Sequence, residues 1–244
     1  MAKNTGVIQL QGNVGNLNFT KGGQVRQKPA SRPATAIRTL ENNSEFSTQT
    51  KASSLIGEAF RASIKTAKSG NWHNRLSQIT REVMKLDLTN VRGQRGVIDD
   101  ETSLYEGYDF NENATLGSVM YAEVEVTVDR ATGVCVAKVL DHTPAVAIAA
   151  PEGATHLKYV ACATEIDFEN ETVNNQTIKS AALPLNNVAL LDIPLSVDLG
   201  TNVAKPILVG FGIEFYQQVN GQMYLLQNGQ YNPFKIVKVD TGVE

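Results

Sequence analysis

The sequence has few cysteines and no long apolar run, and each shortage excludes a class of protein. Two cysteines, Cys135 and Cys162, are too few for a disulfide framework or a four-cysteine zinc site. No apolar stretch is long enough for a membrane-spanning helix, and the first residues lack the apolar core of a secretory signal. We therefore expect cytoplasmic synthesis, buried free thiols and no membrane insertion.

Motifs for catalysis and cofactor binding are also missing. The sequence contains no Gly-x-Ser-x-Gly elbow, no P-loop and no Rossmann glycine pattern. Its three histidines, His73, His142 and His156, do not have the spacing of metal ligands. We therefore expect no catalytic residue, no cofactor and no metal ion, and we predict that the protein is not an enzyme.

Positive and negative charges are separated along the chain. Residues 1–98 contain 15 Lys and Arg against 5 Asp and Glu, whereas residues 99–244 contain 7 against 20. The first 40 residues contain six cations and no acid. Such asymmetry indicates a basic arm that contacts an acidic partner, which is either nucleic acid or the acidic half of a neighbouring copy. A solvated tail without a partner is the alternative.

Residues 1–43 are expected to form this extended basic arm. Alternating residues near Leu17 and the Gly22–Gly23 pair predict a β-hairpin, which is too small to be stable alone and must dock on a body. The predicted contact residues of the arm are apolar or basic: Val14, Leu17, Phe19, Val25, Lys21, Arg26, Lys28, Arg32 and Arg38.

Residues 44–90 are expected to form an αα-hairpin. Apolar residues repeat at three- and four-residue spacing on both sides of a short Ser69–Gly70–Asn71 link. Ser44 is a suitable N-cap for the first helix and Asn71 for the second. Gly70 would end the first helix.

Residues 91–244 read as a body of antiparallel strands. Alternation predicts strands at 119–129, 134–140, 156–166, 189–199, 205–219 and 234–239. The Asn220–Gly221 pair predicts a tight type I′ hairpin turn. The fold class is therefore α+β: an immunoglobulin-like β-sandwich of seven or eight strands, preceded by the αα-hairpin and the arm.

Carboxylates cluster in two places within this body. The first run is Asp99, Asp100 and Glu101, and the second is Asp167, Glu169 and Glu171. Alternate carboxylates in a loop can hold calcium, but the glycine and ligand spacing of an EF-hand are missing. A solvated acidic loop, or an acceptor surface for the basic arm, agrees better with the pattern.

Five segments resemble a known family. They are GNVGNLNFTKGGQVR (12–26), RTLENNSEF (38–46), VDRATG (128–133), APEGATH (150–156) and EFYQQVNG (214–221). The chain resembles, over nearly its whole length, a family of proteins of about this size and of unknown function that is common in Bacteroidota genomes. The resemblance implies a bacterial or phage-borne origin, and it implies no activity.

These observations together favour a non-enzymatic structural subunit. We expect a homo-oligomer that assembles head-to-tail into a filament, a tube or a virion shell, with the arm docked on a neighbouring copy. The first alternative is a monomeric β-sandwich binding module, whose ligand surface would include Tyr216, Tyr224 and Tyr231. The second is a virion protein that contacts nucleic acid, and the third is an enzyme of unrecognised type.

Overall fold

A computed structural model describes residues 2–3, 10–28, 36–226 and 229–242. The chain divides into two compact units, Met1–Leu40 and Glu41–Glu244, called here the arm unit and the body. The fold is mixed α+β, and all strand pairs in the described ranges are antiparallel.

The arm unit contains a small sheet of very short strands. Its strands are β1 (Ala2–Lys3), β2 (Gly12–Val14), β3 (Leu17–Phe19) and β4 (Gln24–Gln27), in the order β1-β4-β3-β2. The predicted hairpin is confirmed as β3 and β4, which pair through a turn closed by a bond from Gly23 N to Thr20 O. Gly23 has φ +72°, a backbone conformation that glycine adopts without steric cost.

The helices differ from the prediction in their bounds. They are α1 (Ile37–Ala59), α2 (Arg61–Ile64), α3 (Trp72–Lys85), the 3₁₀ helix η1 (Asp99–Tyr105), α4 (Leu116–Val119) and α5 (Pro144–Ala147). Ser44 is therefore not the N-cap of α1, because nothing between Ile37 and Ser44 breaks a helix. Asn71 does occupy the N-cap position of α3, although its side chain makes no capping bond.

The body contains two sheets. Their strands are β5 (Val124–Asp129), β6 (Val134–Val139), β7 (His156–Asp167), β8 (Thr172–Lys179), β9 (Leu183–Pro184), β10 (Ile193–Asp198), β11 (Ile207–Val219), β12 (Gln222–Leu225) and β13 (Phe234–Asp240). The smaller sheet has the order β10-β6-β5. The larger has six strands in the path β12-β11-β7-β8, with β13 paired to β11 and β9 to β7.

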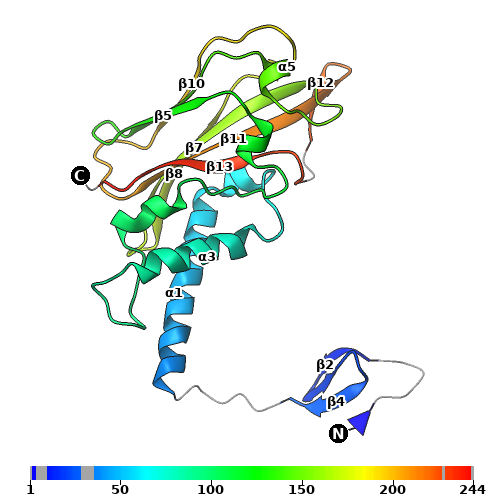
Figure 1. Cartoon of the computed structure of the whole chain (residues 1–244), viewed down its shortest axis with the longest axis vertical. Coiled ribbons are helices and arrows are strands. Elements are labelled where there is room, and N and C mark those ends of the chain that lie inside the picture. Colours follow the sequence, from blue (N-terminus) through cyan, green and yellow to red (C-terminus); the bar gives the residue numbers. More distant parts are fainter. Residues whose placement is uncertain (1, 4–9, 29–35, 227–228, 243–244) are drawn as a thin grey trace. The chain divides into compact units, whose positions relative to one another are not determined.

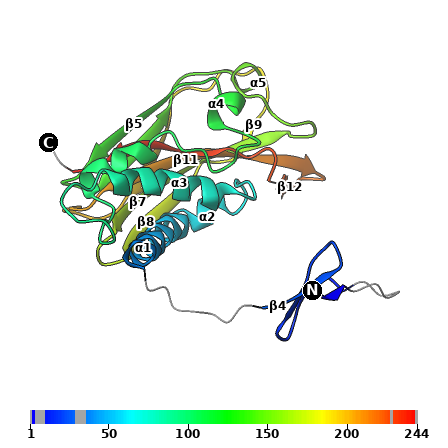
Figure 2. The same ribbon diagram turned by 60° about the horizontal axis from the view of Figure 1, so that its bottom comes forward.

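The six-stranded sheet lies between the three-stranded sheet and the layer formed by α1, α2, α3 and η1, whereas α4 and α5 lie on the side of the small sheet (Figures 1 and 2). Strand β7 shows the consequence, because residues on both of its faces are buried. Tyr159 and Ala161 belong to the apolar cluster shared with the small sheet, whereas Val160 and Cys162 belong to the cluster shared with the helices. A strand covered on both sides reads as a nearly continuous apolar run rather than a strict alternation.

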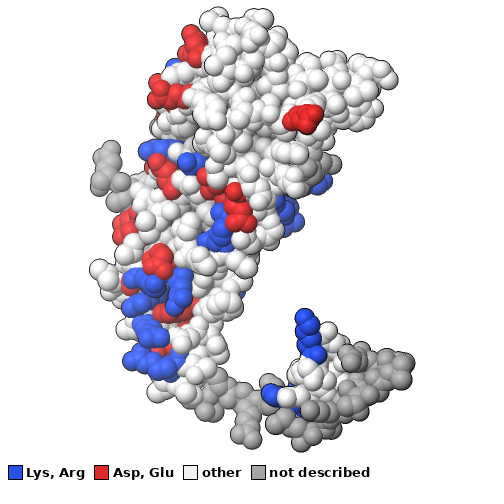
Figure 3. Space-filling view, turned by 45° about the vertical axis from the view of Figure 1, so that its right-hand side comes forward, with Lys and Arg blue, Asp and Glu red and all other residues white. Residues whose placement is uncertain are grey.

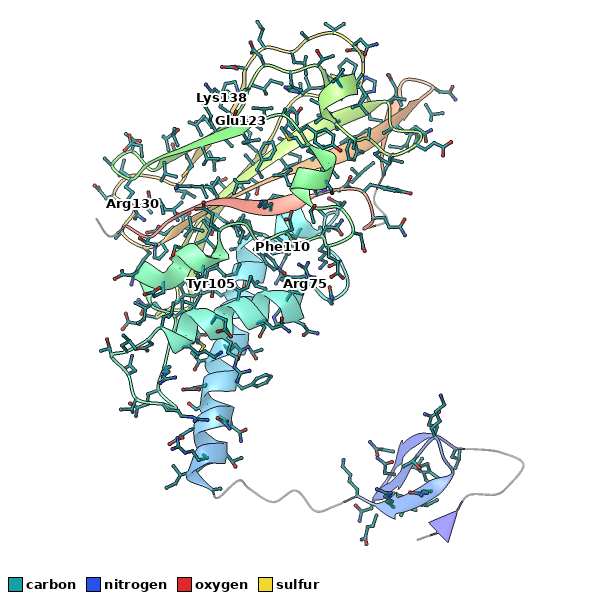
Figure 4. The ribbon with its side chains drawn as sticks, in the orientation of Figure 1. Arg75, Tyr105, Phe110, Glu123, Arg130 and Lys138 are labelled. Carbon is teal, nitrogen blue, oxygen red and sulfur yellow. The ribbon has the colours of Figure 1, made fainter. Side chains whose placement is uncertain are left out.

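The cluster on the helical side is centred on aromatic rings. Phe110 contacts the rings of Phe60, Trp72, Tyr108 and Phe234 at centroid distances of 5.0–5.8 Å. In Figure 4 Phe110 lies between α3 and the sheet. Such aromatic contacts add to the apolar area that the ring buries.

Helix α3 crosses α1 rather than running beside it (Figures 1 and 2). At the crossing, a Cβ on Gly57 would lie 2.5 Å from the Trp72 ring, so a glycine is needed there. A buried hydroxyl chain also joins the helices, since Ser53 and Tyr105 both donate to Thr80 at 3.0 and 3.1 Å. The two helices are therefore held by close approach and by satisfied polar groups.

Two predicted strands begin later in the structure, and one turn was confirmed. Strand β10 begins at Ile193 rather than at Ala189. Strand β5 begins at Val124 rather than at Val119, because Leu116–Val119 forms a helical turn. Strand β8 was not predicted, since its residues are polar and mostly exposed. The Asn220–Gly221 pair adopts φ values of +49° and +79°, as a type I′ turn requires.

Candidate functional site

The register of the arm sheet gathers its apolar residues on one face. Leu17 pairs with Val14 on one side, and Phe19 pairs with Val25 on the other. Residues directly opposite each other in a sheet share a face, and alternate residues of a strand do too. Val14, Leu17, Phe19 and Val25 therefore share one face, which also carries Gln27 opposite Leu17; we call it the arm face. Within it Val14 is 56% exposed and Leu17 43% exposed.

The opposite face of the arm sheet is polar. It carries Asn13, Asn18, Gln24 and Arg26, whose guanidinium donates to the Gln24 amide oxygen at 2.7 Å. Exposed cations surround this sheet and follow it along the chain: Lys21 in the turn, Lys28 after β4 and Arg38 in the first turn of α1. The remaining predicted contact residue, Arg32, lies outside the described residues.

Four of the six predicted acceptor carboxylates lie around one hollow of the body. Asp99, Glu169 and Glu171 line a cavity of about 520 Å³ between α1, the segment before η1 and the β7–β8 turn. Asp167 lies beside it, because Lys205 in the cavity wall approaches both Asp99 and Asp167. Asp100 and Glu101 do not line the cavity and follow in η1. We call this hollow the acidic hollow.

Two lysines partly neutralise the acidic hollow. Lys51 bonds Glu171 at 2.8 Å, and Lys205 lies 3.5 Å from Asp99 and 3.8 Å from Asp167. The negative charge of Asp99 beside it raises the pKa of Lys205. Four carboxylates against two ammonium groups leave the hollow net negative.

The β7–β8 turn explains how these acids come together. Asp167 accepts bonds from the backbone of Glu169 and Asn170 and from the Asn170 amide, which lower the pKa of its carboxyl group. Glu171 adopts φ +54°, which closes the turn into β8. In the part of the chain that the structure describes, no group of three metal-ligating side chains is found. The hydrogen bonds to Asp167 hold the turn in this shape.

The two thiols are buried, and His142 is hydrogen-bonded within the body. Cys135 and Cys162 are free and buried, as predicted. Burial raises the pKa of both thiols, that of Cys135 to about 11, so each stays protonated at neutral pH. His142 is held at both ring nitrogens, with Nδ1 2.8 Å from Leu140 O and Nε2 2.6 Å from the hydroxyl of buried Tyr159.

A buried carboxylate on β11, that of Glu214, was not predicted from the sequence. Glu214 is 2% exposed, and it accepts bonds from Thr66 at 3.2 Å, from Lys179 at 2.7 Å and from the Tyr216 hydroxyl at 2.8 Å. Both carboxylate oxygens thus accept hydrogen bonds from other residues of the body. A single acid in a strand that otherwise reads as apolar was the only sequence signal for this network.

The three tyrosines of the predicted ligand surface have different environments. Tyr216 is half-buried, and its hydroxyl donates a hydrogen bond to Glu214 within the body. Tyr224 on β12 is 57% exposed and Tyr231 is 39% exposed. Only two of the three rings are therefore available at the surface.

A second hollow was also not predicted. It measures about 710 Å³ and lies between α1, the C-terminal half of α3 and the segment 92–95. Its charged lining residues are Glu45, Arg81, Lys85, Arg92 and Arg95. We call it the basic hollow. These cations are 14 positions apart at most in the sequence, and α1, which α3 crosses, supplies the other wall of the cavity.

Comparisons of the chain with protein-family models, with curated proteins and with solved structures found no match. Among the described residues, no helix has the length and apolar character needed to cross a membrane.

Proposed function

We propose that the protein is a non-enzymatic structural subunit that assembles head-to-tail into a filament, a tube or a virion shell. In this proposal the arm unit of one copy docks on the body of the next. The arm face is the observation that carries the proposal. Val14 and Leu17 are exposed and Phe19 and Val25 are half-buried, so covering this face would bury further apolar area and stabilise the sheet.

The size of the arm sheet supports the need for a partner. Its strands have two to four residues each, and the apolar residues of β2, β3 and β4 are the four of the arm face. Small sheets of this kind are marginal in water unless a further surface packs against them. The proposed partner supplies that surface.

Charge supports a second copy as that partner. The first 40 residues contain no acid, whereas residues 99–244 contain 20 acids against 7 cations, and the acidic hollow is net negative. Opposite potentials steer two surfaces together and fix their register. A contact between two different surfaces repeats from copy to copy, and it therefore forms rings or filaments rather than closed dimers.

The proposal includes an immunoglobulin-like sandwich in the body. One apolar cluster contains residues of both sheets, including Ala137 and Leu195 from the small sheet and Phe211 from the large sheet, which supports two facing layers. The helical layer on the other face would be an addition to such a sandwich. Open edges at β8 and β12 would be available for strand addition by the arm of another copy.

The first test compares assembly with and without the arm. Full-length protein and a variant lacking residues 1–36, which keeps the whole of α1, would be examined by light scattering and negative-stain microscopy. We expect large regular particles from the full chain and a soluble monomer from the truncated chain. Monomers from both at high concentration would contradict the proposal.

A second test separates the arm face from the rest of the arm. Phe19→Ser removes an aromatic ring from the arm face, and Asn18→Ser changes the neighbouring residue on the opposite face. We expect the first variant to raise the concentration needed for assembly at least tenfold and the second to leave it unchanged. Equal effects of the two variants would show that the arm face is not the contact.

A charge-reversal cycle tests the acidic acceptor. Asp100→Lys with Glu169→Lys should weaken assembly, and Lys21→Glu with Arg26→Glu should weaken it to a similar degree. All four residues are exposed, and no salt bridge involves them among the described residues. Combining the four changes in one chain should restore assembly, because each copy then carries both reversed surfaces. A further loss in the combined variant would place the acceptor elsewhere.

A further inference from the structure

The basic hollow gathers four cations from two parts of the body. Arg81 and Lys85 come from α3, and Arg92 and Arg95 come from the segment that follows it. In Figure 3 lysine and arginine side chains gather on the lower part of the body, with some acidic side chains among them. Like charges held this close repel one another, so the arrangement favours an anion between them.

The ion pairs and hydrogen bonds within the body involve only some of the four cations. Lys85 pairs with Glu82 at 2.7 Å, and Arg92 bonds the Asn42 amide oxygen at 2.7 Å, with Glu41 at 3.5 Å. Arg81 has no hydrogen bond or ion pair with a described residue, and the buried Nε of Arg95 has no hydrogen-bond partner there. Two guanidinium groups are therefore available to a ligand.

A single buried carboxylate shapes the segment that carries Arg92 and Arg95. Asp87 is 1% exposed and accepts bonds from the backbone N–H groups of Thr89, Asn90 and Gly96 at 2.9–3.0 Å. This closes residues 87–96 into a loop beside α3. A further bond from Gly93 N to the Glu45 carboxylate, at 2.9 Å, fixes the loop to α1. These hydrogen bonds therefore hold the loop that carries the two arginines in one position.

The uncharged lining of the basic hollow has a distinct composition. Besides Met84 it consists of four amide side chains and one aromatic ring: Asn42, Asn43, Gln49, Gln78 and Phe46. Phe46 is 65% exposed although it is a large apolar residue. Amides can bond the edges of bases, an exposed ring can stack on a base, and guanidinium groups bind phosphates.

We propose that the basic hollow binds single-stranded nucleic acid. Arg81, Lys85 and Arg95 would contact the phosphates, and Phe46 would stack on a base. An acidic protein segment would satisfy the cations but would leave the exposed Phe46 ring without a stacking partner. Asn43 and Gln78 are the amides considered for base edges, because Asn42 and Gln49 already bond Arg92 and Ser77 within the body. This site lies in the body, and its existence does not depend on assembly through the arm.

The binding experiment uses the full chain and labelled oligonucleotides. Fluorescence anisotropy would be measured with oligothymidylate, with oligouridylate of the same length and with a duplex of that length, over a series of salt concentrations. We expect both single strands to bind more tightly than the duplex. Affinity should fall steeply with salt, because phosphate contacts release counterions.

Matched variants locate the binding site. Arg81→Gln combined with Arg95→Gln should weaken single-strand binding about tenfold and lower the salt slope by about 1–2, as expected for loss of phosphate contacts. Lys238→Gln removes an exposed cation of β13 and should change neither value. Phe46→Ala should weaken binding at least fivefold without changing the salt slope, since stacking involves no ion release.

Three results would overturn the proposal. The first is no binding of either single strand at low salt by the wild type. The second is an equal loss of affinity in the Arg81→Gln, Arg95→Gln variant and in the Lys238→Gln control. The third is full competition by poly-glutamate together with no effect of Phe46→Ala, which would identify a site for acidic protein segments instead. Circular dichroism of each variant would verify that the fold is retained.

Discussion

The arm sheet and the six-stranded sheet of the body have the same strand direction and similar turns, but they differ in how much apolar surface they bury. Both are antiparallel, and both turn at residues with positive φ, such as Gly23 in the arm and Gly221 in the body. The body sheet has apolar clusters on both faces. In the arm unit, Val14 and Leu17 stay about half exposed.

The difference shows what turn and alternation signals cannot provide. They set where strands begin and end and which residues share a face. Stability comes from the area that the faces bury, and a sheet of two- to four-residue strands buries little of its own. The body is therefore expected to be stable by itself, whereas the arm sheet is expected to need a further surface.

The largest expected effect comes from removing the ring at the centre of the body. Phe110→Ala should lower the free energy of unfolding by about 3–5 kcal/mol, because the cavity cannot close among four other rings. Urea denaturation would measure it. Phe46→Ala, at an exposed site, is the control and should change stability by less than about 0.5 kcal/mol. A small loss for Phe110→Ala would show that the body does not depend on this cluster.

A smaller effect is expected where β11 needs glycine. A Cβ on Gly212 would lie 2.4 Å from the carbonyl oxygen of Pro233, so Gly212→Ala should destabilise the body by about 1–3 kcal/mol. Gly117 in α4 has open space around it, and Gly117→Ala should be neutral or slightly stabilising. Thermal unfolding of the two variants would compare them directly. Equal melting temperatures would mean that β11 can shift away from Pro233.

The loop at Asp87 is held by charge instead of apolar burial. Burial opposes its ionisation, but the bonds from Asn90, Gly96 and Thr89 together lower the pKa of Asp87. A lowered folded pKa means that the stabilisation is complete above the ordinary pKa of about 4 and is lost as the pH falls through the folded value. We expect hydrogen exchange at the Asn90 and Gly96 amides to accelerate selectively in acid. Asp87→Asn should cost about 1 kcal/mol at neutral pH.

The smallest expected effect is that of removing the arm, and it tests directly whether the body is stable without the arm unit. Removing residues 1–36 should leave the unfolding free energy of the body unchanged within about 0.5 kcal/mol, since the two units are separately compact. Dilute samples that contain only monomers are needed, so that assembly does not contribute. A clear loss of stability would show that the arm face is covered by the body of its own chain.

Much of the body followed from periodicity and turn residues. Strands β6, β7, β11 and β13 were predicted close to their observed bounds, because each is a run rich in apolar residues and glycine or asparagine marks the neighbouring turns. Strand β8 was missed, since its exposed Asn and Gln residues resemble a loop. The start of α1 was misplaced because a capping residue is a weaker signal than the absence of a breaker.

The sites were harder to predict than the strands. The arm face needed the pairing register, which places Val14 opposite Leu17 and Phe19 opposite Val25. The basic hollow needed the crossing of two helices, and helix crossing depends on tertiary packing at residues such as Gly57. Single-sequence patterns contain neither kind of information.

The close contact of Trp72 with Gly57 has a spectroscopic consequence. Trp72 is the only tryptophan of the chain, and it lies where α3 crosses α1. Intrinsic tryptophan fluorescence therefore reports on the helical layer alone, whereas far-ultraviolet circular dichroism sums all helices and strands. Superimposable unfolding curves from the two signals would identify one cooperative unit, and an earlier fluorescence transition would mean that the helices detach before the sheets unfold.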